Sequence, residues 1–187
     1  MFKENQIFCF MDYETTGVDT SISTKVRPIQ IGCIYTDVWL NGICSYQSLI
    51  KWPEFLLWDG WPEETIDAYN VHKISFKEVM KGKWCSNVGK DLMEIDKEIR
   101  KSVTSKYKPV IISDAPNFEM FWTQMIFGGL VNKSVFPFHY NAWSIYPMVK
   151  LLDIKIGERP HDALSDAKLM LEGMREVYKK LNLKEQK

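Results

Sequence analysis

Three apolar runs near the start of the chain constrain its fold more than any other feature. Residues 6–12, 28–38 and 43–51 are rich in β-branched and aromatic side chains, and stretches rich in polar residues or glycine separate them. Runs of this kind predict strands. Asn41-Gly42, between the second and third runs, is a strong hairpin signal. We therefore expect the chain to open with a three-stranded antiparallel meander.

Helical and strand patterns alternate along the rest of the chain. Residues 86–104 place an apolar side chain every three or four positions, which is typical of an amphipathic helix. Strands followed by alternating helices and strands predict a mixed α/β sheet with helices packed against it. Residues 52–62, with three Trp and two Pro, are expected to be irregular. The other expected elements are a helix at 63–69, a strand at 110–112, a helix at 116–127, a strand near 136–140 and helices near 144–152 and at 162–181.

Length and charge limit the classes of protein to which the chain can belong. A chain of 187 residues suits a single domain, expected over residues 1–187 with its core at about 6–181. The formal net charge is zero, which argues against the broad basic surface that binds duplex DNA. An enzyme that holds only a few nucleotides of a strand end remains compatible with this charge, because an acidic centre cancels basic residues elsewhere.

The cysteines and the hydropathy pattern predict a cytoplasmic protein. Cys9, Cys33, Cys44 and Cys85 form no C-x-x-C pair, and three of them lie in strand-like apolar runs, so we expect free, buried thiols in a reducing compartment. No run of about 18 apolar residues is present, so no membrane partner is expected. No N-terminal signal sequence is evident either.

Two acids follow the first expected strand on one side of it. Side chains alternate between the two faces of a strand, so Phe8, Phe10, Asp12 and Glu14 share a face. Two desolvated carboxylates side by side repel each other, and a divalent cation would remove that cost. Taken alone, the pair is more simply two solvated acids at the start of a loop, which is expected over residues 13–25.

Another acid interrupts the apolar face of the last expected helix. Helical spacing puts Ala163, Asp166, Met170 and Met174 on one face. An ionised Asp that faces the core is costly unless it is paired or binds a metal, whereas a shifted helix register would place it at the surface. His161 precedes this helix and can turn toward the same centre, although a lone histidine at such a position is more often solvated.

A further acid is expected between residues 114 and 119. Asp114 ends an expected strand, and Glu119 lies in the first turns of the following helix. Either side chain can point into a site at the strand ends, where open α/β sheets bind their ligands. Either can equally stabilise the helix dipole as an N-terminal charge. The residue pattern alone leaves both alternatives open.

Two motifs and a short segment between them form a recognisable set. Residues 10–17 read Phe-Met-Asp-Tyr-Glu-Thr-Thr-Gly, residues 161–166 read His-Asp-Ala-Leu-Ser-Asp, and residues 71–75 read Val-His-Lys-Ile-Ser. Together they resemble the first motif, the third motif and a His-Gly-Ile-Thr-like segment of the DnaQ-like (DEDDh) 3′→5′ exonucleases. RNase T and the proofreading subunit of bacterial DNA polymerase belong to this family. Its second motif usually reads aromatic-Asp, for which Glu119 matches by position and Asp114 by residue type.

The resemblance implies a ribonuclease H-like fold, in which three antiparallel and two parallel strands form a mixed sheet flanked by helices. It implies an exonuclease that acts on the 3′ ends of single-stranded DNA or RNA and releases nucleoside 5′-monophosphates. Two Mg²⁺ or Mn²⁺ ions would be held by Asp12, Glu14, Asp166 and the second-motif acid, since these cations prefer oxygen ligands. His161 would act as the general base.

The resemblance also assigns the turn after the first strand to the terminal nucleotide. Thr15, Thr16 and Gly17 would contact this nucleotide, and Val18 would take the place of a wedge against its base. The plainer alternative is a turn that ends the strand. Related proteins make a homodimer one option for the assembly. Glu119 in place of Asp favours a second function, a weakly active or inactive module that binds nucleic acid or protein.

Three tryptophans of the segment 52–62 have two alternative roles. Trp52, Trp58 and Trp61 can stack on the bases of a single strand. They can also pack beneath the loop that carries them, because large aromatic side chains usually fill such contacts. Four basic residues near the end of the sequence could contact phosphates, although a solvated helix end is the simpler interpretation: Lys179, Lys180, Lys184 and Lys187.

Overall fold

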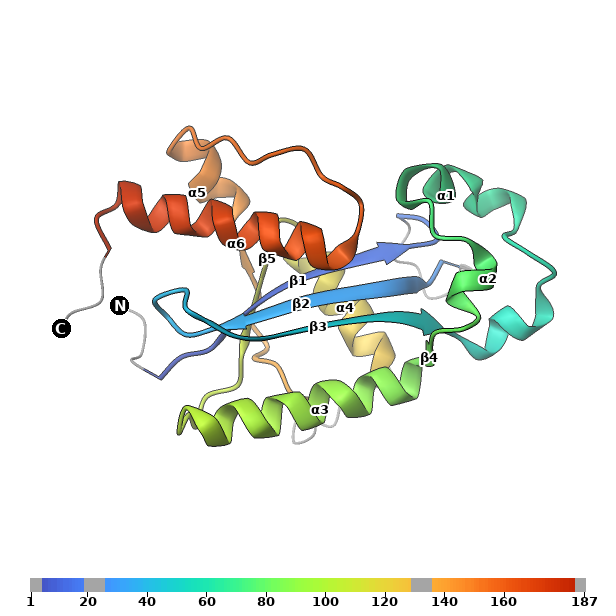
Figure 1. Ribbon diagram of the computed structural model, residues 1–187, viewed down its shortest axis with the longest axis horizontal. Helices are drawn as coiled ribbons and strands as arrows, with labels where there is room; N and C mark the ends of the chain where they lie inside the picture. The colour runs from blue at the N-terminus through green and yellow to red at the C-terminus, as the bar shows by residue number, and fades with distance from the viewer. Residues whose placement is uncertain (1–4, 19–25, 129–135, 184–187) are drawn as a thin grey trace.

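The three apolar runs form adjacent antiparallel strands of a mixed sheet (Figure 1). The computed structural model describes residues 5–18, 26–128 and 136–183. β1 pairs with β2 as far as Thr15, so Asp12 and Glu14 lie within a strand. The loop expected from residue 13 therefore begins later, because the backbone ladder continues past the apolar run. The three strands are β1 (Phe8–Thr15), β2 (Pro28–Thr36) and β3 (Gly42–Lys51).

Parallel strands complete the sheet on both edges. β5 (Val110–Ser113) lies beside β1 and β6 (Trp143–Ser144) beside β5, while β4 (Lys83–Trp84) joins β3. The strand order is β4-β3-β2-β1-β5-β6. The strand expected near residues 136–140 is wrong. Its apolar pattern arises because Phe136 and Phe138 are buried in the core, whereas the pairing with β5 is made at Trp143 and Ser144.

Helices cover both faces of the sheet, and the alternation of β1 side chains separates two cores (Figure 1). Phe8 and Phe10 pack in the core beneath α5 and α6, whereas Cys9 and Met11 pack in the core on the side of α3 and α4. The helices lie close to the positions that their spacing predicts. They are α3 (Cys85–Ser102), α4 (Pro116–Ile126), α5 (Tyr146–Leu151) and α6 (Ala163–Lys180).

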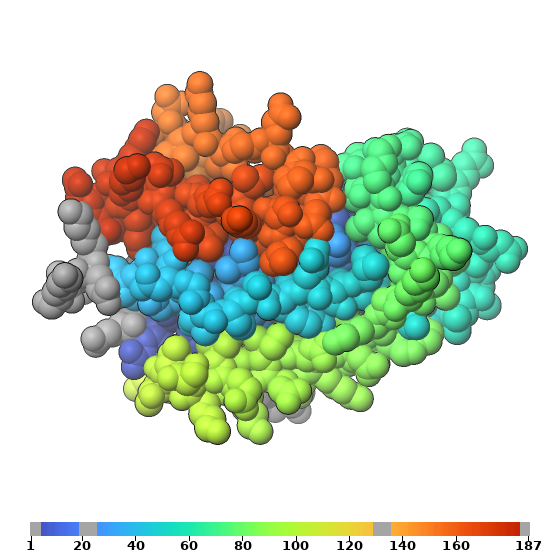
Figure 2. All heavy atoms as spheres, viewed as in Figure 1, coloured from blue at the N-terminus to red at the C-terminus, as the bar shows by residue number. Residues whose placement is uncertain are grey.

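Residues 52–82 gather at one end of the molecule (Figure 2). Phe55 stands at the centre of an aromatic cluster, with its ring centroid 4.7 Å from that of Trp58 and 5.8 Å from that of Trp61. The buried Trp52 donates from Nε1 to the carbonyl oxygen of Pro28 at 2.7 Å. These contacts favour the packing role of the tryptophans. The elements are η1 (Pro53–Leu57), η2 (Glu63–Thr65), α1 (Ile66–His72) and α2 (Phe76–Val79).

The expectation of an irregular segment 52–62 is thus wrong for η1, a short 3-10 helix with proline in its first turn. The helix α2 was not predicted from the sequence. It begins at a capping box formed by Ser75 and Glu78. All four cysteines are free; Cys9 and Cys33 are buried, and the other two are half-buried. Within the described ranges, no helix combines the length and the apolar character that crossing a membrane requires.

Candidate active site

Asp12 and Glu14 project from β1 on the face that α6 covers. They continue the row of Phe8 and Phe10, because alternate residues of a strand share a face. Both acids are buried, with 5% and 8% of their surface exposed, and Asp166 of α6 is only 2% exposed. The other residues expected on this face of α6 are buried as well: Ala163, Met170 and Met174. The strand and the helix therefore bring three acids together in the interior.

The expected acids and the histidine form two groups. One consists of Glu14, His161 and Asp166, the other of Asp12, Asp114 and Glu119. Within each group, one potential ligand atom per residue lies within 4.8 Å of the others. All six residues line a single pocket of about 290 Å³, together with Arg159. Two groups of acids in one pocket form an arrangement that could bind metal ions.

Burial and mutual repulsion raise the pKa values of these acids. Burial raises the pKa of Glu14 to about 7 and that of Glu119 to about 8. The pKa of Asp12 lies well above its usual range because of burial and then the charges of Glu119, Glu14 and Asp166. Burial also raises the pKa of Asp166. A divalent cation would relieve the cost of ionising these groups together.

Glu119 and Asp114 occupy different positions in the pocket. Glu119 is 2% exposed, and its Oε2 accepts a hydrogen bond from Ser113 Oγ at 2.7 Å. The side chain of Asp114 is 31% exposed and forms an ion pair with Arg159. Arg159 Nη1 also lies 4.0 Å from Asp12 Oδ1. Glu119 is therefore the inner acid, whereas Asp114 is at the rim and already has a cationic partner.

Asp166 carries a buried oxygen that has no hydrogen-bond partner in the described part of the chain, Oδ1. Buried polar atoms are nearly always paired, and a bound cation would give this oxygen a partner. The groups around it are carboxylates and one imidazole. Carboxylates are the ligands that Mg²⁺ and Mn²⁺ prefer. The residues therefore fit a divalent metal centre.

The N-terminus of α6 is fixed to β2, and this contact positions Asp166 and His161. Gln30 Oε1 accepts a hydrogen bond from the backbone N–H of Ala163 at 2.9 Å, and its Nε2 donates to Asp162 Oδ1 at 3.1 Å. Asp162 also caps the helix by accepting from the N–H of Ser165. A Cβ on Gly32 would lie 2.2 Å from the carbonyl carbon of Ala163. The role of Gln30 was not predicted from the sequence. The one feature that could have indicated it is the presence of a polar residue within an apolar strand.

His161 is exposed and has a left-handed backbone conformation, with φ of +54°. Such a conformation costs about 1 kcal/mol or more for a residue with a side chain and often occurs at functional sites. His72, in the segment that resembles His-Gly-Ile-Thr, lies near it: burial and the charges of His161 and Lys73 lower the pKa of His72 to about 4. Lys73 has φ of +58°, where the related segment has glycine.

The turn after β1 combines a structural part with an exposed tip. The backbone N–H and the side-chain oxygen of Thr16 pair with the backbone of Arg27, both at 2.9 Å. The Thr15 hydroxyl donates to the carbonyl of Gly17. Val18 is 88% exposed and lines the acidic pocket. Thr16 thus holds the turn, while Val18 is free to contact a ligand.

Solved structures resemble this chain, although no protein-family model and no curated protein matches its sequence. Exonuclease I from Methylocaldum szegediense aligns with a TM-score of 0.70 and 18% identity, over 95% of this chain and 41% of that one. The zinc-bound complex of E. coli exonuclease I with single-stranded DNA aligns with a TM-score of 0.69 and 15% identity, over 96% and 42%. The chain has the fold of the part of exonuclease I with which it aligns.

This exonuclease I fold confirms the expected ribonuclease H-like sheet of antiparallel and then parallel strands flanked by helices. The chain spans about two-fifths of the length of those exonucleases. A complex of E. coli exonuclease I with a dT13 oligonucleotide gives the same TM-score, 0.69, at 15% identity, over 95% of this chain and 42% of the other.

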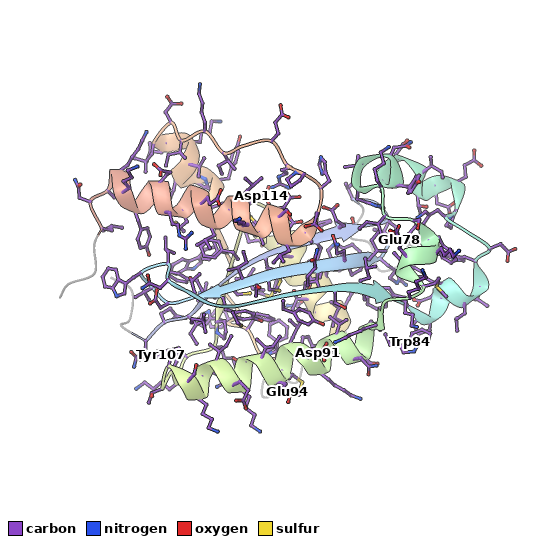
Figure 3. The ribbon with its side chains drawn as sticks, in the orientation of Figure 1. Glu78, Trp84, Asp91, Glu94, Tyr107 and Asp114 are labelled. Carbon is purple, nitrogen blue, oxygen red and sulfur yellow. The ribbon has the colours of Figure 1, made fainter. Side chains whose placement is uncertain are left out.

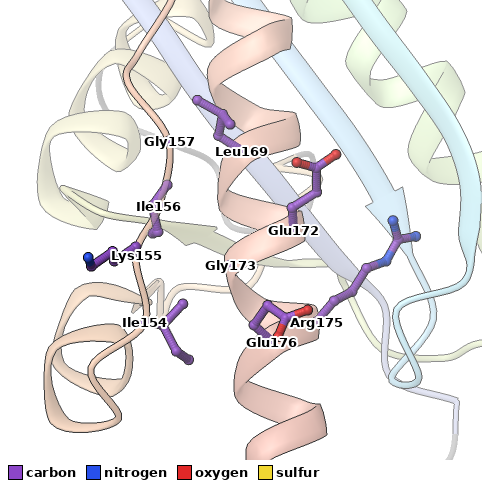
Figure 4. Close-up of a pocket in the computed structure, with 9 residues that line it drawn as sticks. All are labelled: Ile154, Lys155, Ile156, Gly157, Leu169, Glu172, Gly173, Arg175 and Glu176. Carbon is purple, nitrogen blue, oxygen red and sulfur yellow. The ribbon is translucent and has the colours of Figure 1, made fainter.

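A separate cavity of about 360 Å³ lies between α6 and the segment 154–157 that precedes it (Figure 4). Its charged residues, Lys155, Glu172, Arg175 and Glu176, come from the exposed surface of these two segments. None of the acids expected in the site lines this cavity. The candidate site is therefore the acidic pocket, and this cavity is separate from it.

Proposed function

We propose that this chain is a metal-dependent 3′→5′ exonuclease that acts on single-stranded nucleic acid. The observation that carries the proposal is the convergence of two acidic groups and His161 in one pocket on the exonuclease I fold. E. coli exonuclease I has been solved in complex with single-stranded DNA. DNA is therefore the first substrate to test, and RNA is the alternative.

Asp12, Glu14, Asp166 and Glu119 would hold two Mg²⁺ or Mn²⁺ ions. The inner positions of these four acids, their raised pKa values and the unpaired Oδ1 of Asp166 support this assignment. When bound, such ions supply Lewis acidity to phosphate oxygens and lower the pKa of water. Among the candidates for the second-motif acid, we assign Glu119, because Asp114 is at the rim and paired with Arg159.

His161 would take the proton from the attacking water as the general base. A ring nitrogen of His161 lies within 4.8 Å of a carboxylate oxygen of Glu14 and of Asp166, and these charges would stabilise the imidazolium that forms. The water oxygen bonds to phosphorus, the bond to the 3′-oxygen of the preceding nucleotide breaks, and a nucleoside 5′-monophosphate leaves. Val18, exposed at the pocket, would contact the terminal base.

The test is the digestion of 5′-labelled single-stranded DNA and RNA of matched sequence in the presence of Mn²⁺. We expect a ladder that shortens from the 3′ end, and a rate at least about 100-fold lower for Asp12→Asn. The matched control is Glu94→Gln, which removes an exposed carboxylate from α3, away from Asp114 (Figure 3). If the wild-type protein and Asp12→Asn are equally inert, the chain is not an exonuclease, and oligonucleotide binding without cleavage would support the inactive module.

A further inference from the structure

Arg159 is the one arginine or lysine among the described residues that line the acidic pocket. It stands two residues before His161, in the connection between α5 and α6, and 41% of its side chain is exposed. Neither the expected motifs nor the proposed metal centre includes it. Its partly exposed position at an acidic pocket makes it a candidate for contact with a negatively charged ligand.

Two carboxylates hold this guanidinium at the rim. Asp114 forms the ion pair with it, and Asp12 Oδ1 lies 4.0 Å from its Nη1. Asp114 itself is fixed between neighbouring strands, because its carbonyl oxygen accepts a hydrogen bond from Ser144 Oγ at 3.2 Å. Arg159 therefore stands at the rim of the pocket, paired with acids and with 41% of its side chain exposed.

We propose that Arg159 binds the phosphate of the terminal nucleotide and that Asp114 is a positioning residue for Arg159 and not a ligand to metal. This inference rests on the proposed function. The guanidinium group presents donors in a planar fork that matches two phosphate oxygens. Metal ions held by the inner acids would compensate Asp12, so its attraction for Arg159 would weaken while Asp114 retains the guanidinium at the rim.

The charge distribution supports this division of roles. Arg159 lowers the pKa values of Asp12, Glu14, Glu119 and Asp166, all of which burial raises. In the protein without metal, Arg159 thus serves as a partial counter-charge for the inner acids. Its exposure leaves it accessible to a substrate that arrives with negative charge.

The binding of thymidine 5′-monophosphate in the presence of Mn²⁺, measured by isothermal titration calorimetry, tests the role of Arg159. We expect Arg159→Met to weaken binding by roughly tenfold or more, and Arg159→Lys by less, because lysine keeps the charge but loses the fork. Lys155→Met removes an exposed cation from the same connection and should bind like the wild type. Thymidine, which has no phosphate, should not distinguish the variants.

Mn²⁺ binding without nucleotide, measured by electron paramagnetic resonance of the free ion, tests the role of Asp114. Asp114→Asn should keep the wild-type affinity for Mn²⁺ within about threefold and weaken nucleotide binding as Arg159→Met does. Glu119→Gln should lose roughly tenfold or more in Mn²⁺ affinity. An equal loss for Asp114→Asn would overturn its positioning role.

The outcomes separate this inference from the proposed function. If the wild-type protein trims oligonucleotides but Arg159→Met binds the nucleotide as the wild type does, only the role of Arg159 is overturned. A wild-type protein that does not bind the nucleotide also overturns it. The remaining outcome is nucleotide binding that depends on Arg159 in a protein whose wild type does not cleave oligonucleotides. That result would support the phosphate site and overturn the proposed hydrolysis.

Discussion

Asp166 is buried on an otherwise apolar face of α6, where its Oδ1 has no partner among the described residues. Burial raises the pKa of this carboxyl, since a charge far from water is unfavourable. The neighbouring apolar side chains Met170 and Met174 offer no hydrogen bond. In the absence of metal, Asp166 is therefore expected to lower the free energy of unfolding of the protein.

The substitution Asp166→Asn should make the metal-free protein more stable by about 1 kcal/mol, because it removes a buried charge and keeps the shape. Mn²⁺ binds the folded state and should raise the melting temperature of the wild type, but should hardly change that of Asp166→Asn. Thermal unfolding with EDTA and with Mn²⁺ measures both effects. Glu172→Gln, at an exposed position of the same helix, should match the wild type, and an undiminished Mn²⁺ shift in Asp166→Asn would exclude Asp166 as a ligand.

Sequence periodicity could place some residues of the pocket and not others. Asp12, Glu14 and Asp166 each lie in a regular element, so the period of two or 3.6 residues predicted which face they occupy. Arg159 lies in an irregular connection, where no period applies. Gln30 also lies in a strand, but its partners at the start of α6 are more than 130 positions away. Contacts of this range depend on the tertiary packing.

The close contact between α6 and β2 is the element-scale feature that shapes the pocket. Gly32 pairs with Asp12 across the two strands, and the backbone of Ala163 passes directly over it. A side chain at this position would meet backbone atoms that cannot rotate away. The absence of a Cβ therefore determines how deeply the N-terminus of α6, and with it Asp166 and His161, sits over the acids of β1.

The substitution Gly32→Ala is expected to destabilise the protein by about 2 kcal/mol or more, since its Cβ would overlap the backbone of α6. It should also reduce Mn²⁺ affinity, because α6 must move away from Asp12. Urea denaturation and Mn²⁺ titration measure the two effects. Gly42→Ala, in a strand where an added Cβ meets nothing within 4 Å, should leave both unchanged. Equal stability of the two variants would show that α6 is not held by this contact.

Long elements were predictable, whereas short ones were not. The helices α3, α4 and α6 each give several turns of apolar spacing, so their positions followed from the sequence. β4 and β6 have two residues each, which is too short for any alternation to be visible. Their pairing depends on where the longer strands leave free edges. The mistaken strand near 136–140 has a different cause. Phe136 and Phe138 are both buried, and this alternation resembles that of a strand although the segment pairs with no other strand.

At the scale of the whole molecule, a chain of zero net charge gathers a group of its acids in one pocket. Five carboxylates line the pocket, whereas Arg159 is the one arginine or lysine among the described lining residues. Such a concentration of like charge opposes folding unless protons or metal ions compensate it. The stability of the metal-free protein should therefore depend on pH in a way that the metal abolishes.

The direction of this dependence follows from the pKa values. Glu14 and Glu119 have pKa values of about 7 and about 8 in the folded protein, well above those of exposed glutamates. Their protonation in the folded state therefore stabilises the fold at low pH, and this contribution is lost progressively as the pH rises from the pKa of an exposed glutamate to about 7 for Glu14 and about 8 for Glu119. His72 acts in the opposite sense, because its pKa of about 4 makes stability fall as the pH drops below about 6.5.

The interval from about pH 6.5 to about pH 8.5 thus excludes the contribution of His72 and contains the folded-state pKa values of both glutamates. In EDTA, the melting temperature of the wild type should fall by several degrees across this interval, and Mn²⁺ should stabilise the protein most at its upper end. Glu119→Gln cannot ionise at this position, so its melting temperature should fall less. Glu94→Gln, on α3, should follow the wild type.

A wild-type curve that is flat in EDTA, or that Glu119→Gln does not alter, would mean that Glu119 is already ionised at neutral pH without a metal. The buried acids would then need no bound cation to coexist, and the electrostatic argument for the metal centre would fail.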